Sequence, residues 1–265
     1  QLKFIIISGY AEFEYVKQAI DRKVDGYLLK PVDEDELIEA LLDAALNTIL
    51  TFVAGSPVEM PWAAKAKAIV WNWYAGCESG TALAEVLLGR VNPSGHLPET
   101  FPVALADEPA HRIGTFGLKG HVDYKEDIYV GYRYFDTKQV PVLFPFGHGL
   151  SYTSFEYSDL TVRRVDDEIR VSLTVRNTGK RAGKTVAQVY LGLEGTGEDR
   201  PAKELKGFAK VALETGESRQ VEIAMPVAKA LRYWSNVSGA YALAPQARVY
   251  VGESVEDIRL SGRVA

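Results

Sequence analysis

Short apolar runs alternate with helically spaced apolar positions in the N-terminal part of the chain. The runs have the length and β-branched character of strands buried on both faces of a parallel sheet. The predicted strands are residues 4–7, 27–29, 48–53 and 68–71. Apolar residues recur every three or four positions between the strands, which predicts helices. The predicted helices are residues 11–20, 33–45 and 80–88. This alternation predicts a parallel α/β sheet with helices on both faces, and Asp33 is placed to cap the second helix.

The pattern changes twice further along the chain. Residues 92–157 are rich in proline, glycine and aromatic side chains, which predicts an extended segment of turns held in place by packing. The apolar period then becomes two, as in the stretch 169–175, where apolar and polar residues alternate. We therefore expect two domains, an α/β domain at 1–155 and a β-sandwich at 156–265.

Composition and charge narrow the functional classes. The chain has 265 residues, of which 47% are hydrophobic and 25% charged, as is ordinary for a soluble two-domain protein. A net charge of -5 without a lysine- and arginine-rich run argues against a nucleic-acid partner, and no apolar run is long enough for a membrane span. Cys77 is the single cysteine, so we expect no disulfide and no paired-cysteine metal site. We expect neither a metal nor a cofactor.

The start of the chain bears on its location. No secretory signal is visible, which favours the cytoplasm. The chain begins at Gln1 without a methionine, so we expect its start to be incomplete.

Two motifs near the start resemble the second half of a response-regulator receiver domain. Residues 6–15 read Ile-Ile-Ser-Gly-Tyr-Ala-Glu-Phe-Glu-Tyr, and residues 26–31 read Gly-Tyr-Leu-Leu-Lys-Pro. The resemblance implies that Ser8, Tyr27 and Lys30 stand where receivers hold residues that work with a phosphorylated aspartate. The acidic half that would carry this aspartate is not visible. We therefore interpret the three residues as an inherited framework remnant within residues 1–45.

Most of the remaining chain resembles family 3 glycoside hydrolases, the β-glucosidase and β-xylosidase group. Characteristic segments occur in order, among them Ala-Gly-Ser-Pro-Val-Glu-Met-Pro-Trp and Lys-Glu-Leu-Lys-Gly-Phe. The matching segments are 54–62, 73–80, 89–98, 129–136, 144–152, 177–179 and 203–208. The resemblance implies an N-terminal barrel with an aspartate nucleophile, an α/β domain that often contributes the acid/base glutamate, and a C-terminal fibronectin type III-like domain. Neither the barrel nor the usual acid/base segment is visible here.

The two resemblances overlap in one predicted helix. Residues 33–42 fit both families, because both place an amphipathic helix between parallel strands at this point. We therefore expect a chimera in which receiver-like residues 1–45 and hydrolase-like residues 34–155 form one flavodoxin-like hybrid sheet, followed by the fibronectin type III-like sandwich. A half-replaced sheet can leave an exposed edge strand, which would allow homodimerisation.

Residual glycoside hydrolysis would need a pair of carboxyl groups. Retaining enzymes hold the pair about 5 to 5.5 Å apart and inverting enzymes about 6.5 to 9.5 Å apart. Glu126 lies next to a segment that approaches the active site in the family, and it could pair with Asp123 or Glu78. The corresponding substrate-facing residues are Tyr129, Tyr132, Arg133 and Tyr134.

Acyl transfer is a second chemistry that the sequence leaves open. Ser79 begins a predicted helix after a strand, where backbone N–H groups can hold an oxyanion. His148 could act as its base, oriented by Asp123 or Asp127. No Gly-x-Ser-x-Gly elbow accompanies Ser79, and in the family this glycine-rich corner is structural.

Three functions follow from these readings. The first is a truncated or chimeric C-terminal module of a family 3 glycoside hydrolase, which is a hydrolase by descent. The second is an ester hydrolase that uses Ser79 and His148 on a small ester. The third is a non-catalytic carbohydrate-binding or scaffold module.

Overall fold

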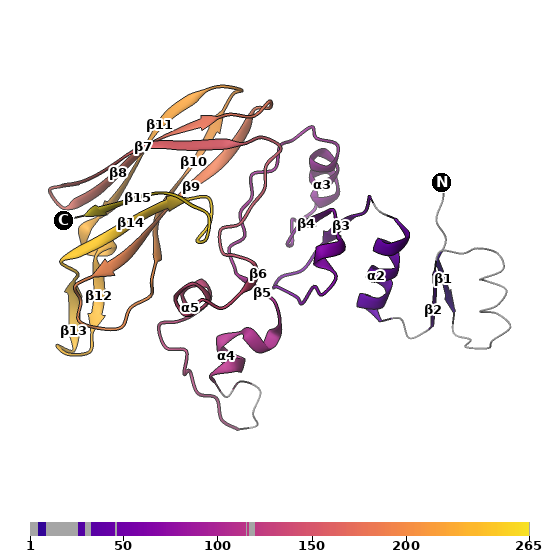
Figure 1. The fold of residues 1–265 in the computed structure, drawn as a ribbon, viewed down its shortest axis with the longest axis horizontal. Coiled ribbons are helices and arrows are strands. Elements are labelled where there is room, and N and C mark those ends of the chain that lie inside the picture. Colours follow the sequence, from indigo (N-terminus) through magenta and orange to yellow (C-terminus); the bar gives the residue numbers. More distant parts are fainter. Residues whose placement is uncertain are drawn as a thin grey trace. The chain divides into compact units, whose positions relative to one another are not determined.

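A computed structural model describes residues 5–8, 26–29, 33–45, 47–114, 116 and 120–264. The chain divides into two compact units, residues 1–83 and 84–265. Figure 1 labels the helices and strands along the chain. In the part of the chain that the structure describes, no helix is long and apolar enough to cross a membrane.

The first unit contains two parallel strand pairs. Strand β1 (Ile5–Ser8) pairs with β2 (Gly26–Leu29), and β3 (Ile49–Phe52) pairs with β4 (Ala68–Trp71). These four strands and their parallel direction were predicted from the apolar runs. The pairs form separate two-stranded sheets, so a flavodoxin-like sheet is not shown. Apolar runs locate strands, but they do not specify which strands pair.

Burial in β3 also differs from the expectation. The four residues alternate between exposed and half-buried positions, and Ile49 is 50% exposed. A strand buried on both faces was predicted, because a continuous apolar run is typical of such strands. The described residues instead bury only one face of β3, and they do so with aromatic side chains. The Phe52 ring stacks at 5.5 Å on Trp62 and at 5.3 Å on Trp71.

Helix α2 (Glu34–Ala44) lies between the two strand pairs in the chain. It begins at the predicted cap, where the Asp33 carboxylate accepts hydrogen bonds from the backbone N–H groups of Asp35 and Glu36 at 3.0 and 3.1 Å. Trp62, only 2% exposed, donates its indole N–H to the Asp35 carboxylate at 2.7 Å. The helix is therefore attached to the segment around η1 (Ala63–Lys65) by a buried indole.

We expect Asp33→Ala to destabilise the first unit by about 1 kcal/mol, because it removes the acceptor for two backbone N–H groups of α2. Asp33→Asn should retain almost full stability, since asparagine is an equally good cap. Urea titration followed by circular dichroism measures both. Equal losses in the two variants would contradict the capping role.

The second unit begins with the segment that was expected to be extended and pinned by packing. Helix α3 (Ser79–Leu87) leads into it across the boundary between the units. Strand β5 (Phe101–Pro102) pairs antiparallel with β6 (Val142–Phe144). The other short elements of the segment are η2 (Leu105–Asp107), α4 (Pro109–Arg112) and α5 (Tyr132–Lys138). The side chains of Phe101, Tyr134 and Phe135 are buried, so packing holds this segment as predicted.

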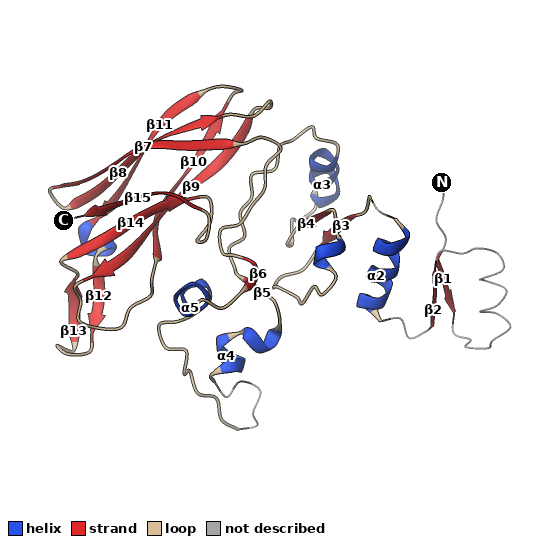
Figure 2. Ribbon diagram, in the orientation of Figure 1, coloured by secondary structure: helices blue, strands red, loops and turns tan. Residues whose placement is uncertain are grey.

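The rest of the second unit is an antiparallel β-sandwich (Figure 2). One sheet has the order β10-β9-β14-β15 and the other β11-β8-β7. The strands are β7 (Phe155–Val165), β8 (Glu168–Asn177), β9 (Gly183–Glu194), β10 (Glu204–Leu213), β11 (Ser218–Pro226), β14 (Gln246–Gly252) and β15 (Ile258–Val264). A short helix α6 (Val227–Ala230) and a hairpin of β12 (Arg232–Ser235) and β13 (Ala240–Leu243) complete the unit.

The core of the sandwich follows the period-two pattern. The inward residues of β8, which are Ile169, Val171, Leu173 and Val175, are completely or almost completely buried. They pack in one cluster with apolar residues of β9 and β14 from the other sheet. The predicted β-sandwich is confirmed.

Candidate functional site

The proposed ester-hydrolysing residues lie in different units. Ser79 begins α3 as predicted, and its backbone N–H donates to the Gly76 carbonyl at 3.2 Å. It belongs to the first unit, whereas His148 belongs to the second. The Ser79–His148 site therefore stays a prediction. The His148 ring is half-buried and stacks on Phe144, with ring centroids 5.5 Å apart.

His148 is expected to make stability depend on pH. Burial, and then the nearby His96, lower the pKa of His148 below its usual 6.5. The imidazole of His148 therefore binds a proton more readily in the unfolded chain than in the folded chain. The stability contributed by the neutral imidazole is fully present above pH 6.5 and is lost as the pH falls through the folded-state pKa. We expect His148→Gln to make the stability of the second unit less sensitive to pH in this range. Urea unfolding at several pH values measures this, and an unchanged slope would contradict it.

The acidic candidates lie in the loop before α5. Asp123 is paired with His121 at 2.6 Å and with Lys125 at 3.3 Å, so its charge is already balanced. Glu126 is half-buried, and its Oε2 atom has no hydrogen-bond partner among the described residues. Glu78, the other suggested partner of Glu126, belongs to the first unit. The carboxylate pair therefore stays a prediction.

The predicted substrate-facing segment is a packed part of the second unit. The Tyr132 ring stacks on Phe146 at 4.4 Å, and its hydroxyl accepts a hydrogen bond from the Leu205 backbone N–H at 2.8 Å. Tyr134 is buried. Burial, and then Asp199, raise the pKa of Tyr129 to about 12, so this phenol stays protonated at neutral pH. Tyr132 and Tyr134 therefore anchor the segment by packing.

Ion pairs attach this segment to the sandwich. Asp136, whose side chain is 7% exposed, pairs at 2.9 Å with Lys203, whose side chain is 15% exposed. Lys203 also donates to the Val255 carbonyl at 2.8 Å. The Glu204 carboxylate lies between three cations, with Arg133 at 3.8 Å, Arg200 at 3.6 Å and Lys206 at 3.5 Å. We call Asp136, Lys203, Glu204 and Arg133 the ionic joint.

The sequence motifs contained this joint without revealing it. Asp136 ends the motif 129–136, and Lys203 and Glu204 begin the motif 203–208. The opposite charges at the ends of two motifs were the available signal. Helix α5 carries Arg133 and Asp136 on two successive turns, so that one helix presents both charges to the start of β10.

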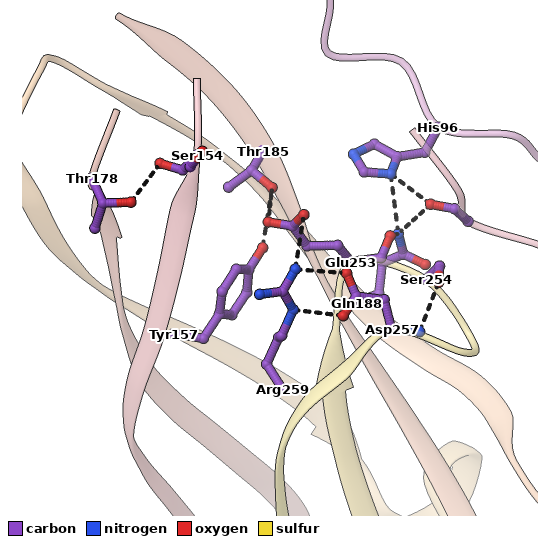
Figure 3. A network of polar contacts seen from close by, with 11 residues as sticks. His96, Ser154, Tyr157, Thr178, Thr185, Gln188, Glu253, Ser254, Asp257 and Arg259 are labelled. Atoms are coloured by element: carbon purple, nitrogen blue, oxygen red, sulfur yellow. Dashed lines mark hydrogen bonds and ion pairs between the residues drawn. The ribbon is translucent and has the colours of Figure 1, made fainter. Parts of the chain in front are cut away.

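A second polar network connects the loop at residue 147 with the sandwich, and Figure 3 shows His96, Gln188 and Glu253 among its side chains. Gln188, which is buried, donates to the carbonyls of Gly147 and Glu253 and accepts a hydrogen bond from the Tyr190 hydroxyl at 2.6 Å. His96 Nδ1 lies 2.6 Å from the Gly147 carbonyl. Gly147 has φ +82, and a side chain there would collide with the Gln188 amide. Neither Gln188 nor Glu253 lies in a motif that the sequence pattern indicated.

Two of the three receiver-like residues lie within the described residues. Ser8 is the last residue of β1, one position beyond the predicted strand, and Tyr27 lies in β2. Their proposed role as a framework remnant stays a prediction. Lys30 lies outside the described residues.

The fold and motifs agree with one family, and the chain belongs to it: glycosyl hydrolase family 3. The model of the family's C-terminal domain matches residues 15–152, and that of the fibronectin type III-like domain matches residues 185–255. The architecture is therefore a family 3 C-terminal domain followed by a fibronectin type III-like domain. The boundary at 155/156 stays a prediction.

Relatives of known name agree. Thermostable beta-glucosidase B of Acetivibrio thermocellus is 40% identical over 264 residues, which are 98% of this chain and 34% of that protein. Probable beta-glucosidase J of Neosartorya fischeri is 46% identical over 221 residues, which are 80% of this chain and 26% of that protein. The chain thus spans about a quarter to a third of these relatives.

Solved structures match as well. The crystal structure of a beta-glucosidase from Kluyveromyces marxianus in complex with glucose has a TM-score of 0.82 and 42% identity, over 87% of this chain and 28% of that one. Beta-glucosidase 3B from Thermotoga neapolitana, in complex with glucose, has a TM-score of 0.80 and 36% identity, over 97% of this chain and 39% of that one.

The comparisons give the receiver resemblance no support. The family 3 model already begins at residue 15, and the relative from Acetivibrio thermocellus matches 98% of the chain. The interpretation of residues 1–45 as part of a receiver, and with it the chimera, is therefore unsupported. The amphipathic helix at 33–42 fits both families, which is why the sequence pattern alone did not separate them.

Proposed function

We propose that this chain acts as the C-terminal module of an enzyme that hydrolyses β-glucosides. The observation that carries the proposal is the ordered match of both C-terminal family models, at residues 15–152 and 185–255. The relatives and solved structures described above are all named beta-glucosidases. Neither the ester hydrolase nor the non-catalytic binding module has comparable support.

The module's contribution is the placement of the aromatic segment 129–134. Glycoside hydrolysis depends on holding the sugar against two carboxyl groups, and small displacements of positioning residues reduce the rate strongly. The ionic joint and the Tyr132 hydroxyl fix this segment to the sandwich at several points. In this proposal, the sandwich holds the segment rigid, and the family's barrel supplies the nucleophile.

A segment exchange tests the proposal. In beta-glucosidase B of Acetivibrio thermocellus, the 264 matched residues are replaced by this chain, and hydrolysis of an aryl β-glucoside is measured. We expect the exchanged enzyme to retain activity, whereas the chain alone should show none. A folded but inactive exchange would contradict the proposal, and so would turnover by the chain alone.

Two point variants of this hybrid enzyme test the positioning role of the ionic joint. The same hybrid carrying Arg133→Met should lose activity, because the substitution removes one cation from Glu204 at the joint. Arg170→Met, which disrupts exposed pairs on the sandwich, is the control and should leave activity unchanged. A positioning role predicts a lower kcat with an unchanged melting temperature of the second unit, which contains Arg133.

A further inference from the structure

A cavity of about 360 Å³ lies within the second unit, next to the polar network of Figure 3. Its walls come from the segments 93–96 and 149–155, from the start of β9, and from Glu253 after β14 and Arg259 in β15. The volume is at the lower end of the range of about 300–1,000 Å³ that small-molecule sites occupy. Its size therefore suits a small ligand.

One wall of the cavity is held by the Asn92 amide. Its oxygen accepts hydrogen bonds from the Tyr152 backbone N–H at 2.8 Å and from the Ser151 hydroxyl at 3.0 Å. Its nitrogen donates to the Ala182 carbonyl at 3.0 Å. The loop that contributes Ser151 and Ser154 to the cavity is thereby attached to the sandwich, so the wall is formed before any ligand arrives.

The neighbours of His96 define its tautomer. The Gly147 carbonyl, 2.6 Å from Nδ1, can only accept a hydrogen bond, so Nδ1 carries a proton. The Gln188 amide donates its two hydrogens to the carbonyls of Gly147 and Glu253, so none is left for His96 Nδ1. Nδ1 therefore does not need to act as an acceptor, and it donates to the Gly147 carbonyl. In the tautomer with the proton on Nδ1, Nε2 is the hydrogen-bond acceptor of the ring, and His96 lines the cavity.

The charges that line the cavity balance each other. Arg259 makes two hydrogen bonds to Asp257, at 2.6 and 2.7 Å, and its guanidinium also lies 4.0 Å from the Glu253 carboxylate, so its charge is compensated. Lys184 contributes one positive charge and Glu253 one negative charge, and a Glu253 oxygen accepts a hydrogen bond from Thr185 at 3.3 Å. Glu253 would repel a bound anion, and Lys184 would repel a bound cation. The lining thus disfavours both kinds of ion.

We propose that this cavity binds a neutral polyhydroxylated molecule of monosaccharide size. Each hydroxyl of such a ligand both donates and accepts hydrogen bonds. The cavity offers acceptors at Glu253 and His96 and a donor at Lys184, while the Phe155 ring provides an apolar surface. The site is separate from the aromatic segment 129–134, none of whose residues lines it.

The test uses the 265-residue chain and titration calorimetry with D-glucose, myo-inositol, cyclohexanol and inorganic phosphate. We expect both polyols to bind with one site, and cyclohexanol and phosphate not to bind. Since myo-inositol contains no glycosidic bond, it reports on the cavity independently of any hydrolytic function. Binding of phosphate in preference to the polyols, or no binding by either polyol, would overturn the proposal.

Two variants locate the site. Lys184→Met removes the charged donor and should weaken polyol binding about tenfold, whereas Lys180→Met, a matched change at an exposed lysine outside the cavity lining, should not. Ser154→Phe should abolish binding by filling the cavity, and Ser158→Phe on the same strand region is its control. Polyol binding that survives Ser154→Phe in a folded protein would place the ligand elsewhere and overturn the assignment.

Discussion

Lys203→Met should destabilise the second unit by about 3–5 kcal/mol, which is the usual cost of removing one partner of a buried ion pair. The substitution leaves the Asp136 carboxylate, with a side chain only 7% exposed, without the ammonium group that lies 2.9 Å away. It also removes the hydrogen bond to the Val255 carbonyl. Urea unfolding of the second unit, followed by hydrogen exchange in the sandwich strands, measures the loss.

Arg170→Met is the control for this experiment. Arg170 pairs with Glu168 at 3.0 Å and Glu222 at 3.3 Å, but all three side chains are more than 40% exposed. Exposed pairs typically contribute between 0 and about 1 kcal/mol, so the control should have little effect. Similar losses in the two variants would show that the joint is no stronger than a surface pair.

A double-mutant cycle separates the ion pair from the loss of packing. Asp136→Asn combined with Lys203→Met removes both charges, so the double variant should be more stable than the sum of the single losses predicts. This recovery is expected because the stranded charge, rather than the missing attraction, causes most of the cost. Additive losses would contradict the ionic explanation.

Local features of this chain could be read from the sequence. The Asp33 cap, the positions of the four N-terminal strands and the alternation in β8 depend on neighbouring residues, and each was found where it was expected. The motif comparison also led to the correct family, because its segments occur in a fixed order.

Features that depend on long-range pairing could not be read in this way. The apolar runs did not show that β1–β2 and β3–β4 form separate sheets. The pairing of Asp136 with Lys203 joins residues that lie in different motifs, and only the folded chain brings them together. The cavity has the same origin, because its walls come from four separate parts of the second unit.

Asn177 illustrates both sides of this contrast. The sequence indicated a turn at 177–179, and the structure shows that the turn depends on a buried amide. The Asn177 oxygen accepts hydrogen bonds from the Thr153 hydroxyl at 2.7 Å and the Gly179 N–H at 3.1 Å. Its nitrogen donates to the carbonyls of Arg181 at 2.7 Å and Leu213 at 3.3 Å. One fully buried side chain thus connects the turn at 177–181 with the loop at Thr153 and with the end of β10.

We expect Asn177→Ala to destabilise the second unit by roughly 3–5 kcal/mol, because each buried partner left without a hydrogen bond costs about 1–3 kcal/mol and the loop relaxes only in part. Asn177→Asp keeps the shape but turns a carboxylate oxygen toward the Arg181 and Leu213 carbonyls. At neutral pH this variant should lose at least as much stability as the alanine variant. Calorimetry of both variants at neutral pH measures this.

The pH dependence of the aspartate variant identifies the cause. Burial among acceptors raises the pKa of a carboxyl group, and its protonated form can donate to the Arg181 carbonyl as the amide does. The folded state then binds the proton more tightly than the unfolded state, so the variant should be least destabilised below the unfolded-state pKa of about 3.9 and lose stability as the pH rises. Asn177→Ala has no such group, so its loss relative to the wild type should not depend on pH. A pH-independent loss in Asn177→Asp would mean that the amide only fills space, whereas recovery in acid would show that donation to these carbonyls holds the turn.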